Sequence, residues 1–348
     1  MAVLLLTVAA LLAAGCSGSK PTAADQPLAT TEASAQASTT TEAPTTTTTA
    51  TTTPPPPTYP LTGRPVTDPS KAARAAVAVK IDNIAEARPQ SGIGHADVVY
   101  EEFTEGVTRF IVVFHSDDAE VVGPVRSVRP ADPVIVTPLG GVFGFSGGSP
   151  GAEALARAAP LTIVTEADTA VMYRRSFRLA PHNLYTSTAG LFSRVPPEAG
   201  SPRAFAQFLK EGENFFGPGI MPVASLHVVP APQVVADYEW DAPTRTWTRF
   251  TDGRPHVLED GQVGPTTVIV QFTPYVTFID DYNVIYPEVV GSGEAWVLAS
   301  GQMVRGTWAK DAPGAVTTFT NADGAPIALP PGQTWVHLVS PGTTVTTG

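Results

Sequence analysis

The sequence of 348 residues contains a single cysteine, so it cannot form an intrachain disulfide. Charged residues make up 15% of the chain, and Asp and Glu outnumber Lys and Arg by 32 to 21, which gives a formal net charge of -11. A protein that binds the phosphate backbone of nucleic acids needs a basic surface. The folded part must therefore rely on its hydrophobic core, and the composition argues against nucleic-acid binding.

Long hydrophobic runs and metal-binding patterns are also missing. After the N-terminus no stretch of 18 apolar residues occurs, which argues against a polytopic membrane protein. The 6 histidines show none of the paired spacings that zinc sites use. We therefore expect no metal site and no cofactor.

The N-terminus indicates where the protein works. Residues 2–15 form an apolar run that is too short to span a membrane comfortably and ends in small residues, as the core of a signal peptide does. The single cysteine, Cys16, follows directly, and residues 12–16 resemble the lipobox of bacterial lipoproteins, in which the thiol is acylated. We expect a signal peptide over residues 1–15, lipidation at Cys16, and a location on the outer face of the bacterial cytoplasmic membrane.

A change in composition separates the N-terminus from the folded part. Residues 38–58 hold 12 Thr and 5 Pro and no aromatic residue, which is too little apolar surface to offset the entropy of ordering. We predict a disordered Thr/Pro-rich tether over residues 16–60. An N-terminal domain over residues 61–212 and a C-terminal domain over residues 225–342 are expected to follow.

The pattern after the tether predicts an α+β fold. Short β-branched and aromatic runs predict strands over residues 75–82, 97–103, 109–115 and 141–145. Helices are expected to begin at Ser149-Pro150 and at Ser201-Pro202, where a capping serine precedes a proline. After residue 212 the pattern is strand and turn throughout. We expect a mixed α/β N-terminal domain followed by a mostly β C-terminal domain, folded as a roll, a sandwich or a small barrel.

Several strings in a fixed order resemble the DUF3048 family of bacterial proteins. In the first half they are Ile81-Asp82-Asn83, Ala87–Gly92, Ala96–Glu101, Thr108–Phe110, Gly123–Pro130, Gly147–Pro150 and Arg178–Thr186. In the second half they are Asn283–Ile285, Gly291–Ala295, Trp308–Lys310 and Gly332–Trp335. The resemblance covers residues 61–340 and implies an extracytoplasmic lipoprotein with two domains, but it implies no particular reaction.

One basic segment suggests an anion site. Residues 121–210 carry 9 basic and 5 acidic residues in an otherwise acidic chain. Arg126 and Arg129 lie in this segment, and arginine grips phosphate or carboxylate with two parallel hydrogen bonds. Gly147, Gly148 and Ser149 precede a predicted helix, whose N-terminal amides favour an anion. The alternative is that the glycines only make the turn.

The partner of the arginine pair is also left open by the sequence. Arg126 and Arg129 are expected to hold either an external anion or a buried carboxylate, such as Asp97 or Glu101. The two cases respond differently to mutation, since removing one partner of a buried ion pair strands a charge.

His182 is the residue best suited to acid/base chemistry. It lies between Pro181 and Asn183, close in sequence to several arginines, and Asn183 is included in the predicted ligand site. A histidine oriented by a carboxylate can act as general acid or base. The candidate catalytic residues are therefore His182 with Asp97 or Glu101, and Asp82 is a further possible orienting carboxylate. The alternative is that hydrogen bonds of the imidazole only fix a long loop.

The string from Gly144 to Gly148 matches the Gly-x-Ser-x-Gly pattern of a nucleophile elbow. The predicted helix begins at Ser149-Pro150, three residues too late for Ser146 to sit in the strand-to-helix turn. We do not expect a serine hydrolase.

Together these features predict a lipid-anchored envelope protein that binds an anionic wall component or an envelope protein partner. An envelope hydrolase or transferase that uses His182 in the same pocket is the alternative. A third hypothesis is a purely structural protein whose β domain docks on a membrane-protein partner.

Overall fold

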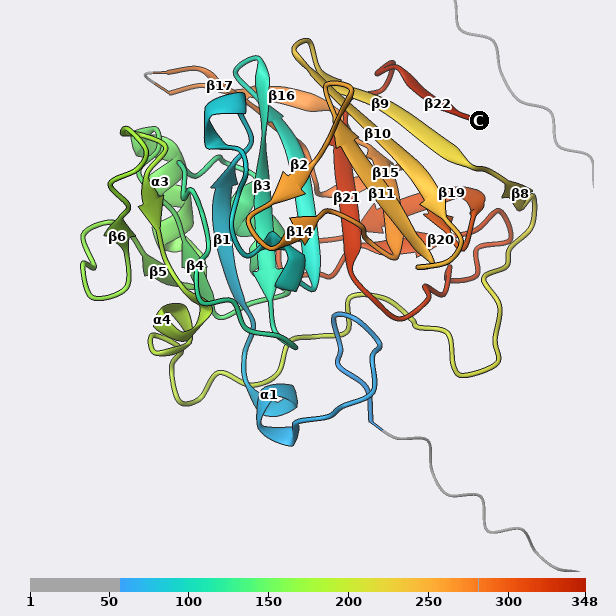
Figure 1. The fold of residues 1–348 in the computed structure, drawn as a ribbon, viewed down its shortest axis with the longest axis horizontal. Helices are drawn as coiled ribbons and strands as arrows, with labels where there is room; N and C mark the ends of the chain where they lie inside the picture. Colours follow the sequence, from blue (N-terminus) through green and yellow to red (C-terminus); the bar gives the residue numbers. More distant parts are fainter. Residues whose placement is uncertain (1–56, 281) are drawn as a thin grey trace, which may run out of the picture. The chain divides into compact units, whose positions relative to one another are not determined.

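A single mixed sheet of eleven strands runs through most of the molecule (Figure 1). The computed structural model describes residues 57–280 and 282–348, so the predicted signal peptide, Cys16 and nearly all of the predicted tether lie outside it. Ten strands of this central sheet follow one another in the order β20 (Thr318–Thr320), β19 (Gln302–Lys310), β18 (Gly291–Ala299), β15 (Thr267–Phe272), β21 (Thr334–Val339), β2 (Val98–Thr104), β3 (Val107–Phe114), β1 (Val77–Asp82), β4 (Val142–Gly144) and β5 (Thr162–Val164), and β8 (Met221–Pro222) pairs with β19.

The two halves of the chain meet inside this sheet. Strand β21, from the end of the sequence, lies between β15 and β2 and pairs in parallel with both. Residues of the predicted N-terminal and C-terminal domains therefore contribute to one continuous layer. The domain boundaries expected from the sequence stay a prediction.

A second, five-stranded sheet packs against the C-terminal half of the first. Its strands lie in the order β12 (Arg254–Pro255), β11 (Thr246–Thr251), β10 (Val234–Asp241), β9 (Ser225–Ala231) and β22 (Val345–Thr347). Side chains that alternate along these strands, such as Tyr238 and Trp247, share a buried cluster with Val268 and Leu298 of the central sheet. Of the three C-terminal folds expected, the structure shows the sandwich.

The helices are few and short, and two of them, α3 and α4, lie at the β4–β5 end of the sheet (Figure 1). On one face α2 (Asp132–Val136) and α3 (Pro150–Ala158) share the core with Val98 and Ile111. On the other face α4 (Thr188–Phe192) contacts β1 and β4. The remaining elements are α1 (Pro69–Ala73), η1 (Ala85–Ala87), η2 (Ile93–His95) and three hairpins, β6–β7 (Tyr173–Arg174, Leu184–Tyr185), β13–β14 (Val257–Leu258, Gly261–Gln262) and β16–β17 (Tyr275–Phe278, Val284–Pro287). No helix in the described ranges is both long enough and apolar enough to cross a membrane.

The predicted α+β class and its four N-terminal strands are confirmed. The helix at Ser149-Pro150 is confirmed as well, and the Ser149 hydroxyl caps it by accepting from the amide of Ala152. The helix expected after Ser201-Pro202 is wrong. That segment has no regular secondary structure because its amides donate to other parts of the chain, Phe205 to the carbonyl of Pro60 at 2.9 Å and Leu209 to that of Leu329 at 2.8 Å. Tertiary contacts here outweigh the local helical pattern.

Candidate functional site

The candidate site lies where several strands of the central sheet end. Strands β1, β4 and β5 run parallel, so their carboxyl ends meet at one edge. Asp82 is the last residue of β1, Ser146 follows β4 by two residues, and Glu166 follows β5 by two residues. Arg109 of β3 lies opposite Asp82 in the antiparallel register. We call this the carboxyl edge, and in α/β sheets it is where ligands bind.

Asp82 holds His182 and Arg126 together. Its carboxylate is fully buried and lies 2.7 Å from Nδ1 of His182 and 3.0 Å from Nε of Arg126. The side chains of His182 and Arg126 keep 17% and 19% of their surface exposed, so both reach solvent from a buried base. In the described part of the chain, the terminal nitrogens of Arg126 have no protein partner. The geometry leaves the outer faces of both side chains available to a ligand.

Arg109 adds a second, nearly buried guanidinium. Its side chain is only 8% exposed, yet its Nε has no hydrogen-bond partner among the described residues. Its other contacts are long, 3.4 Å to the carbonyl of Ser127 and 3.8 Å to Glu105. Burial and the neighbouring charges of Arg129 and Arg126 lower the pKa of Arg109 to about 10. Of the three neighbouring arginines, Arg109 is therefore the one without a close acceptor among the described residues. We call Asp82, Arg109, Arg126 and His182 the arginine site.

Arg129, predicted as a ligand residue, already has hydrogen-bond partners within the protein for its side-chain nitrogens. Its Nη2 pairs with Glu105, its Nε donates to the Thr104 hydroxyl at 2.8 Å, and its Nη1 donates to the Val128 carbonyl at 2.9 Å. Arg129 therefore brings charge to the arginine site but has few donors to offer a ligand.

Asn183 lies in a polar rim next to His182. Its side-chain oxygen accepts from Arg174 at 2.7 Å, and Arg174 also pairs with Glu166 at 2.9 Å. Glu166 accepts in turn from the Ser146 hydroxyl at 2.9 Å. These groups are exposed, so the rim is open to water. Ser146 is engaged with a carboxylate there.

The residues Ser146, Gly147 and Gly148 form a loop, here called the glycine loop, whose backbone is hydrogen-bonded to the segment that carries Arg126. The amide of Ser146 donates to the carbonyl of Arg126, and the carbonyl of Gly147 accepts from Val128, both at 2.9 Å. Gly147 has a φ of +65°, which favours glycine, and a Cβ on Gly148 would lie 2.7 Å from a methyl of Val128. The two glycines thus allow the loop to pack against the segment that carries Arg126 and Arg129.

An internal carboxylate lies at the N-terminus of α3. Hydrogen bonds from the Ser149 hydroxyl, and from amides that include that of Gly151, lower the pKa of Asp280 below its ordinary value. Asp280 comes from the tip of the β16–β17 hairpin, 131 residues after Ser149. The N-terminus of α3, one of the predicted anion-binding features, therefore already faces the carboxylate of Asp280. Asp280 is not a member of the arginine site.

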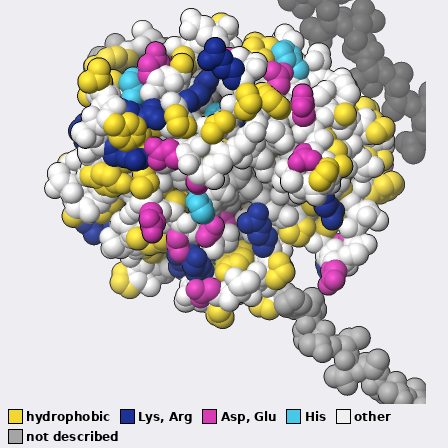
Figure 2. Space-filling view, viewed as in Figure 1, with side chains coloured by type: hydrophobic (Ala, Val, Ile, Leu, Met, Phe, Trp, Pro, Cys, Tyr) yellow, Lys and Arg dark blue, Asp and Glu magenta, His cyan; other side chains and the backbone are white. Residues whose placement is uncertain are grey.

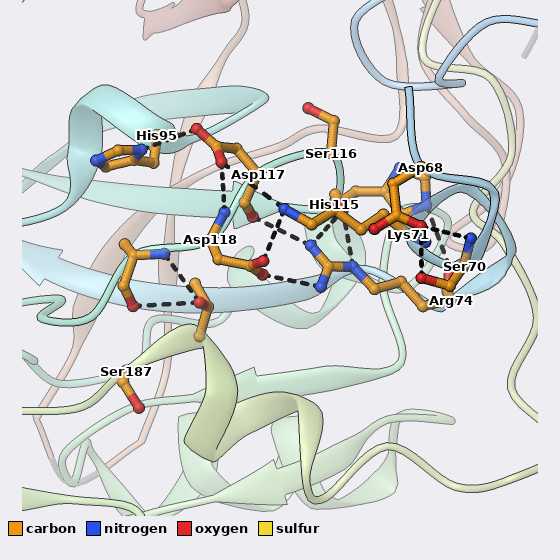
Figure 3. Close-up of polar contacts among 12 residues, drawn as sticks. Asp68, Ser70, Lys71, Arg74, His95, His115, Ser116, Asp117, Asp118 and Ser187 are labelled. Carbon is orange, nitrogen blue, oxygen red and sulfur yellow. Dashed lines mark hydrogen bonds and ion pairs between the residues drawn. The ribbon is translucent and has the colours of Figure 1, made fainter. Parts of the chain in front are cut away.

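Asp97 lies far from His182. It precedes β2, whereas the carboxyl edge is at the other end of that strand. Its carboxylate accepts from the amides of His115 at 2.6 Å and Ser116 at 3.1 Å, and burial raises its pKa to about 6. Figure 3 shows the neighbouring ion pairs at this end of the sheet, in which Asp118 binds Lys71 and Arg74. Asp97 fixes the end of β3.

Glu101 belongs to a buried network between the two halves of the chain. It pairs with Arg249 at 2.8 Å, accepts from the Thr108 hydroxyl at 2.7 Å and lies 3.3 Å from His337. Burial would raise the pKa of Glu101, but the charges of Arg249 and His337 outweigh it and hold the pKa below its ordinary value. With every atom of these ion pairs excluded from solvent, Glu101 is available neither to His182 nor to a ligand.

The structure therefore joins His182 to Asp82, not to Asp97 or Glu101. The sequence offers Asp82 as one of three carboxylates that could orient His182. Its local pattern does not place Arg109, Glu105 or Glu166 near the site. Arg109 had a usable signal, since pairing β1 with β3 as an antiparallel neighbour sets it opposite Asp82. Glu105 follows from the same pairing, at the turn between β2 and β3.

The fold and this edge define an α+β protein built on one mixed sheet, with a cationic site where the parallel strands end. Residues 61–200 match the profile described as "Protein of unknown function (DUF3048) N-terminal domain", and residues 227–336 match the profile described as "Protein of unknown function (DUF3048) C-terminal domain". The chain belongs to the DUF3048 family, which confirms the resemblance found in the sequence.

A curated relative and a solved structure agree with this assignment. The chain is 28% identical over 300 residues to "Putative lipoprotein YerB" of Bacillus subtilis (strain 168), a match that covers 80% of this chain and 85% of that protein. The crystal structure of YerB protein from Bacillus subtilis is similar with a TM-score of 0.71 and 24% identity, covering 83% of this chain and 99% of that one. The second likeness concerns the fold alone.

Proposed function

We propose that this protein is a lipid-anchored envelope protein that binds an anionic wall component at the arginine site. The lipobox before Cys16 and the name of the Bacillus relative support the anchor and the extracytoplasmic location. Fractionation of cells that express Cys16→Ala tests this part, since a high-salt wash is expected to release the variant from the membrane and to leave the parent protein bound. A variant that stays with the membrane after a high-salt wash would show that another anchor exists.

One observation supports ligand binding above the others, namely the state of Arg109. A guanidinium that is nearly excluded from water but has only long contacts is unfavourable unless something else supplies acceptors. A carboxylate or phosphate placed between Arg109 and Arg126 would accept from both. Carboxylates and phosphates are the anionic groups of wall polymers and their fragments, and an acidic segment of an envelope protein would offer the same chemistry.

Replacing Arg126 tests the site directly. Arg126→Ala is expected to weaken binding of inorganic phosphate and of muramyl dipeptide, a carboxylate-bearing wall fragment, by at least tenfold. The reason is that a hydrogen bond to a charged group contributes about 1.5–3 kcal/mol. The fold should be little affected, because Asp82 keeps its hydrogen bond to His182. Isothermal titration measures the affinity, and thermal unfolding measures the stability.

The matched control is Arg305→Ala, which removes the same charge from an exposed position on β19, where the guanidinium lies over Trp296. Its affinity for both probes should equal that of the parent protein. If the parent protein binds neither anion and Arg126→Ala costs several kcal/mol of stability, Arg126 only braces Asp82 and the binding hypothesis fails.

The contact between His182 and Asp82 favours a second function, an envelope hydrolase or transferase. With Nδ1 donating to the carboxylate, Nε2 of the neutral imidazole has its lone pair free to take a proton from water or a hydroxyl group. Mass spectrometry of wall fragments incubated with the protein and with His182→Gln tests this. Turnover by the parent that is lost in His182→Gln would support catalysis, and turnover that persists in the variant would exclude His182 as the base.

A further inference from the structure

Two hairpin tips beside the arginine site expose large apolar side chains. Leu179 and Phe177, in the β6–β7 hairpin, are 86% and 57% exposed, and Ile279 and Tyr282, in the β16–β17 hairpin, are 86% and 69% exposed. These are four of the five most exposed large apolar side chains in the described ranges, and the fifth is Phe216. Their concentration on two tips, in a protein with an extensive core, points to a surface that is covered in use.

The first tip is built onto the arginine site. Leu179 and His182 close one turn, in which the amide of His182 donates to the carbonyl of Leu179 at 3.0 Å. The imidazole of His182 then points to Asp82. Leu179 therefore lies one turn from the arginine site, on its solvent side.

The second tip reaches the same edge from the other side of the glycine loop. Phe278 and Asp280 contact the start of α3, where Asp280 interacts with the Ser149 hydroxyl. The glycine loop in turn bonds to the backbone of residues 126–128. Strand β17 also packs against β2, whose end carries Glu105. The two tips thus border the arginine site on two sides.

Positive charge accompanies the first tip. The stretch from residue 169 to residue 197 contains no Asp or Glu, although the chain as a whole has a net charge of -11. Arg174 and Arg175 pair with Glu166 and Glu259 from other segments, but Arg178 donates to the carbonyls of Glu86, Arg88 and Pro89 and forms no ion pair with a carboxylate of residues 57–280 or 282–348. Figure 2 shows dark blue and yellow side chains intermixed over the region of α3 and β6.

An exposed apolar tip beside basic groups, as the β6–β7 hairpin presents, is what a protein needs to lie on an anionic lipid surface, and the β16–β17 hairpin adds the apolar side chains of Ile279 and Tyr282 next to Asp280. Apolar side chains enter the boundary between head groups and acyl chains, and basic groups attract anionic head groups. A soluble wall fragment would use the arginines but would leave Leu179 and Ile279 in water. The apolar tips therefore favour a lipid surface over a free fragment.

We propose that the tips of the β6–β7 and β16–β17 hairpins insert into the membrane surface and that the arginine site holds the phosphate of an anionic phospholipid head group. This inference rests on the proposed function, because it gives the same site its anion. It assigns that anion to a lipid, and it adds a second contact with the membrane to the anchor predicted at Cys16.

The test uses the full chain from residue 16 with Cys16→Ser, so that no lipid anchor contributes. Vesicles of phosphatidylcholine with one quarter phosphatidylglycerol should carry the protein down on sedimentation, and vesicles of phosphatidylcholine alone should carry down at least tenfold less. The double change Leu179→Ser and Ile279→Ser should lower binding to the anionic vesicles by at least tenfold, because both side chains lose their apolar contact. The control Phe216→Ser, at a site elsewhere that is 73% exposed, should bind as the parent does.

The outcomes separate this inference from the proposed function. Binding that is lost in the double variant, with an unchanged melting temperature, supports insertion of the tips. Binding that survives the double variant overturns insertion, even where Arg126→Ala abolishes it. If the parent protein binds inorganic phosphate but no vesicle, the proposed function stands and the membrane inference fails; if it binds neither, both fail.

The depth of the tip gives an independent readout. In Leu179→Trp, the tryptophan fluorescence added by the new side chain should shift to shorter wavelength on anionic vesicles, and brominated lipid should quench it. An added signal that neither shifts nor is quenched, in a variant that still sediments with the vesicles, would place the tip outside the lipid and overturn insertion.

Discussion

Arg249→Met is expected to lower the free energy of unfolding by about 3–5 kcal/mol, the cost typical of stranding one partner of a buried ion pair. Arg249 has no exposed surface and donates to Glu101 and to the Tyr238 hydroxyl. Its side chain also lies over the ring of Trp335, with the guanidinium carbon 4.8 Å from the ring centroid. Methionine fills part of the volume but leaves the carboxylate of Glu101 without its main counter-charge.

Chemical denaturation of the parent and the variant measures this loss. The matched control is the double variant Arg249→Met with Glu101→Gln, which removes the stranded charge and should recover part of the stability. A single variant that unfolds within 1 kcal/mol of the parent would show that water or a rearrangement compensates Glu101, and that the network does not hold the two halves of the chain together.

Lys80→Met is expected to have an effect of similar size on the other face of the sheet. The ammonium group of Lys80 is fully buried and lies between two carboxylates, pairing with Glu102 and, at 2.8 Å, with Asp132. Burial and the charge of Asp132 raise the pKa of Glu102 to about 7 even with Lys80 present. Without the lysine, two buried carboxylates would face each other, and we expect a loss of about 3–5 kcal/mol at pH 8.

The pH dependence of this loss has a definite sign. Because the pKa of Glu102 is raised in the folded state, the folded protein binds this proton more tightly than the unfolded chain does. The contribution of Glu102 to stability therefore falls as pH rises from about 4.5 to about 7. Lys80→Met should strengthen this trend, so its loss should be larger at pH 8 than at pH 5.

Lys310→Met is the control for the lysine experiment. Lys310 is also nearly buried, but its ammonium group donates to the carbonyl of Ala315 and has no carboxylate partner in the described ranges. Burial lowers its pKa to about 8. Its loss of stability should therefore change little between pH 5 and pH 7. If the loss of stability in Lys80→Met does not grow with pH, electrostatic repulsion between Glu102 and Asp132 does not contribute to it.

The local elements of this fold could be predicted from the sequence because local signals specify them. Ser149-Pro150 gives α3 its cap and its first turn, and the runs 75–82 and 109–115 are short and rich in β-branched or aromatic residues, as strands are. The segment after Ser201-Pro202 has equally good local signals but forms no helix, since its amides pair with the carbonyls of Pro60 and Leu329. Periodicity alone cannot weigh such distant contacts.

The placement of β21 was beyond sequence reasoning for the same reason. A strand at the end of the chain that enters in parallel between β15 and β2 leaves no trace in the local pattern. The candidate site shows the same limit. The basic segment and His182 could be singled out by residue type. Choosing Asp82 over Asp97 needs the knowledge of which end of a strand each carboxylate occupies, and excluding Glu101 needs the knowledge that it pairs with the buried Arg249.

The most direct test of the arginine site is a crystal structure of the protein grown with inorganic phosphate. Binding of an anionic group predicts density for the ion at the carboxyl edge, within hydrogen-bond distance of Arg109 Nε and of the terminal nitrogens of Arg126. An empty site, with Arg109 turned to pair closely with Glu105 and Arg126 closed onto Asp82, would contradict it.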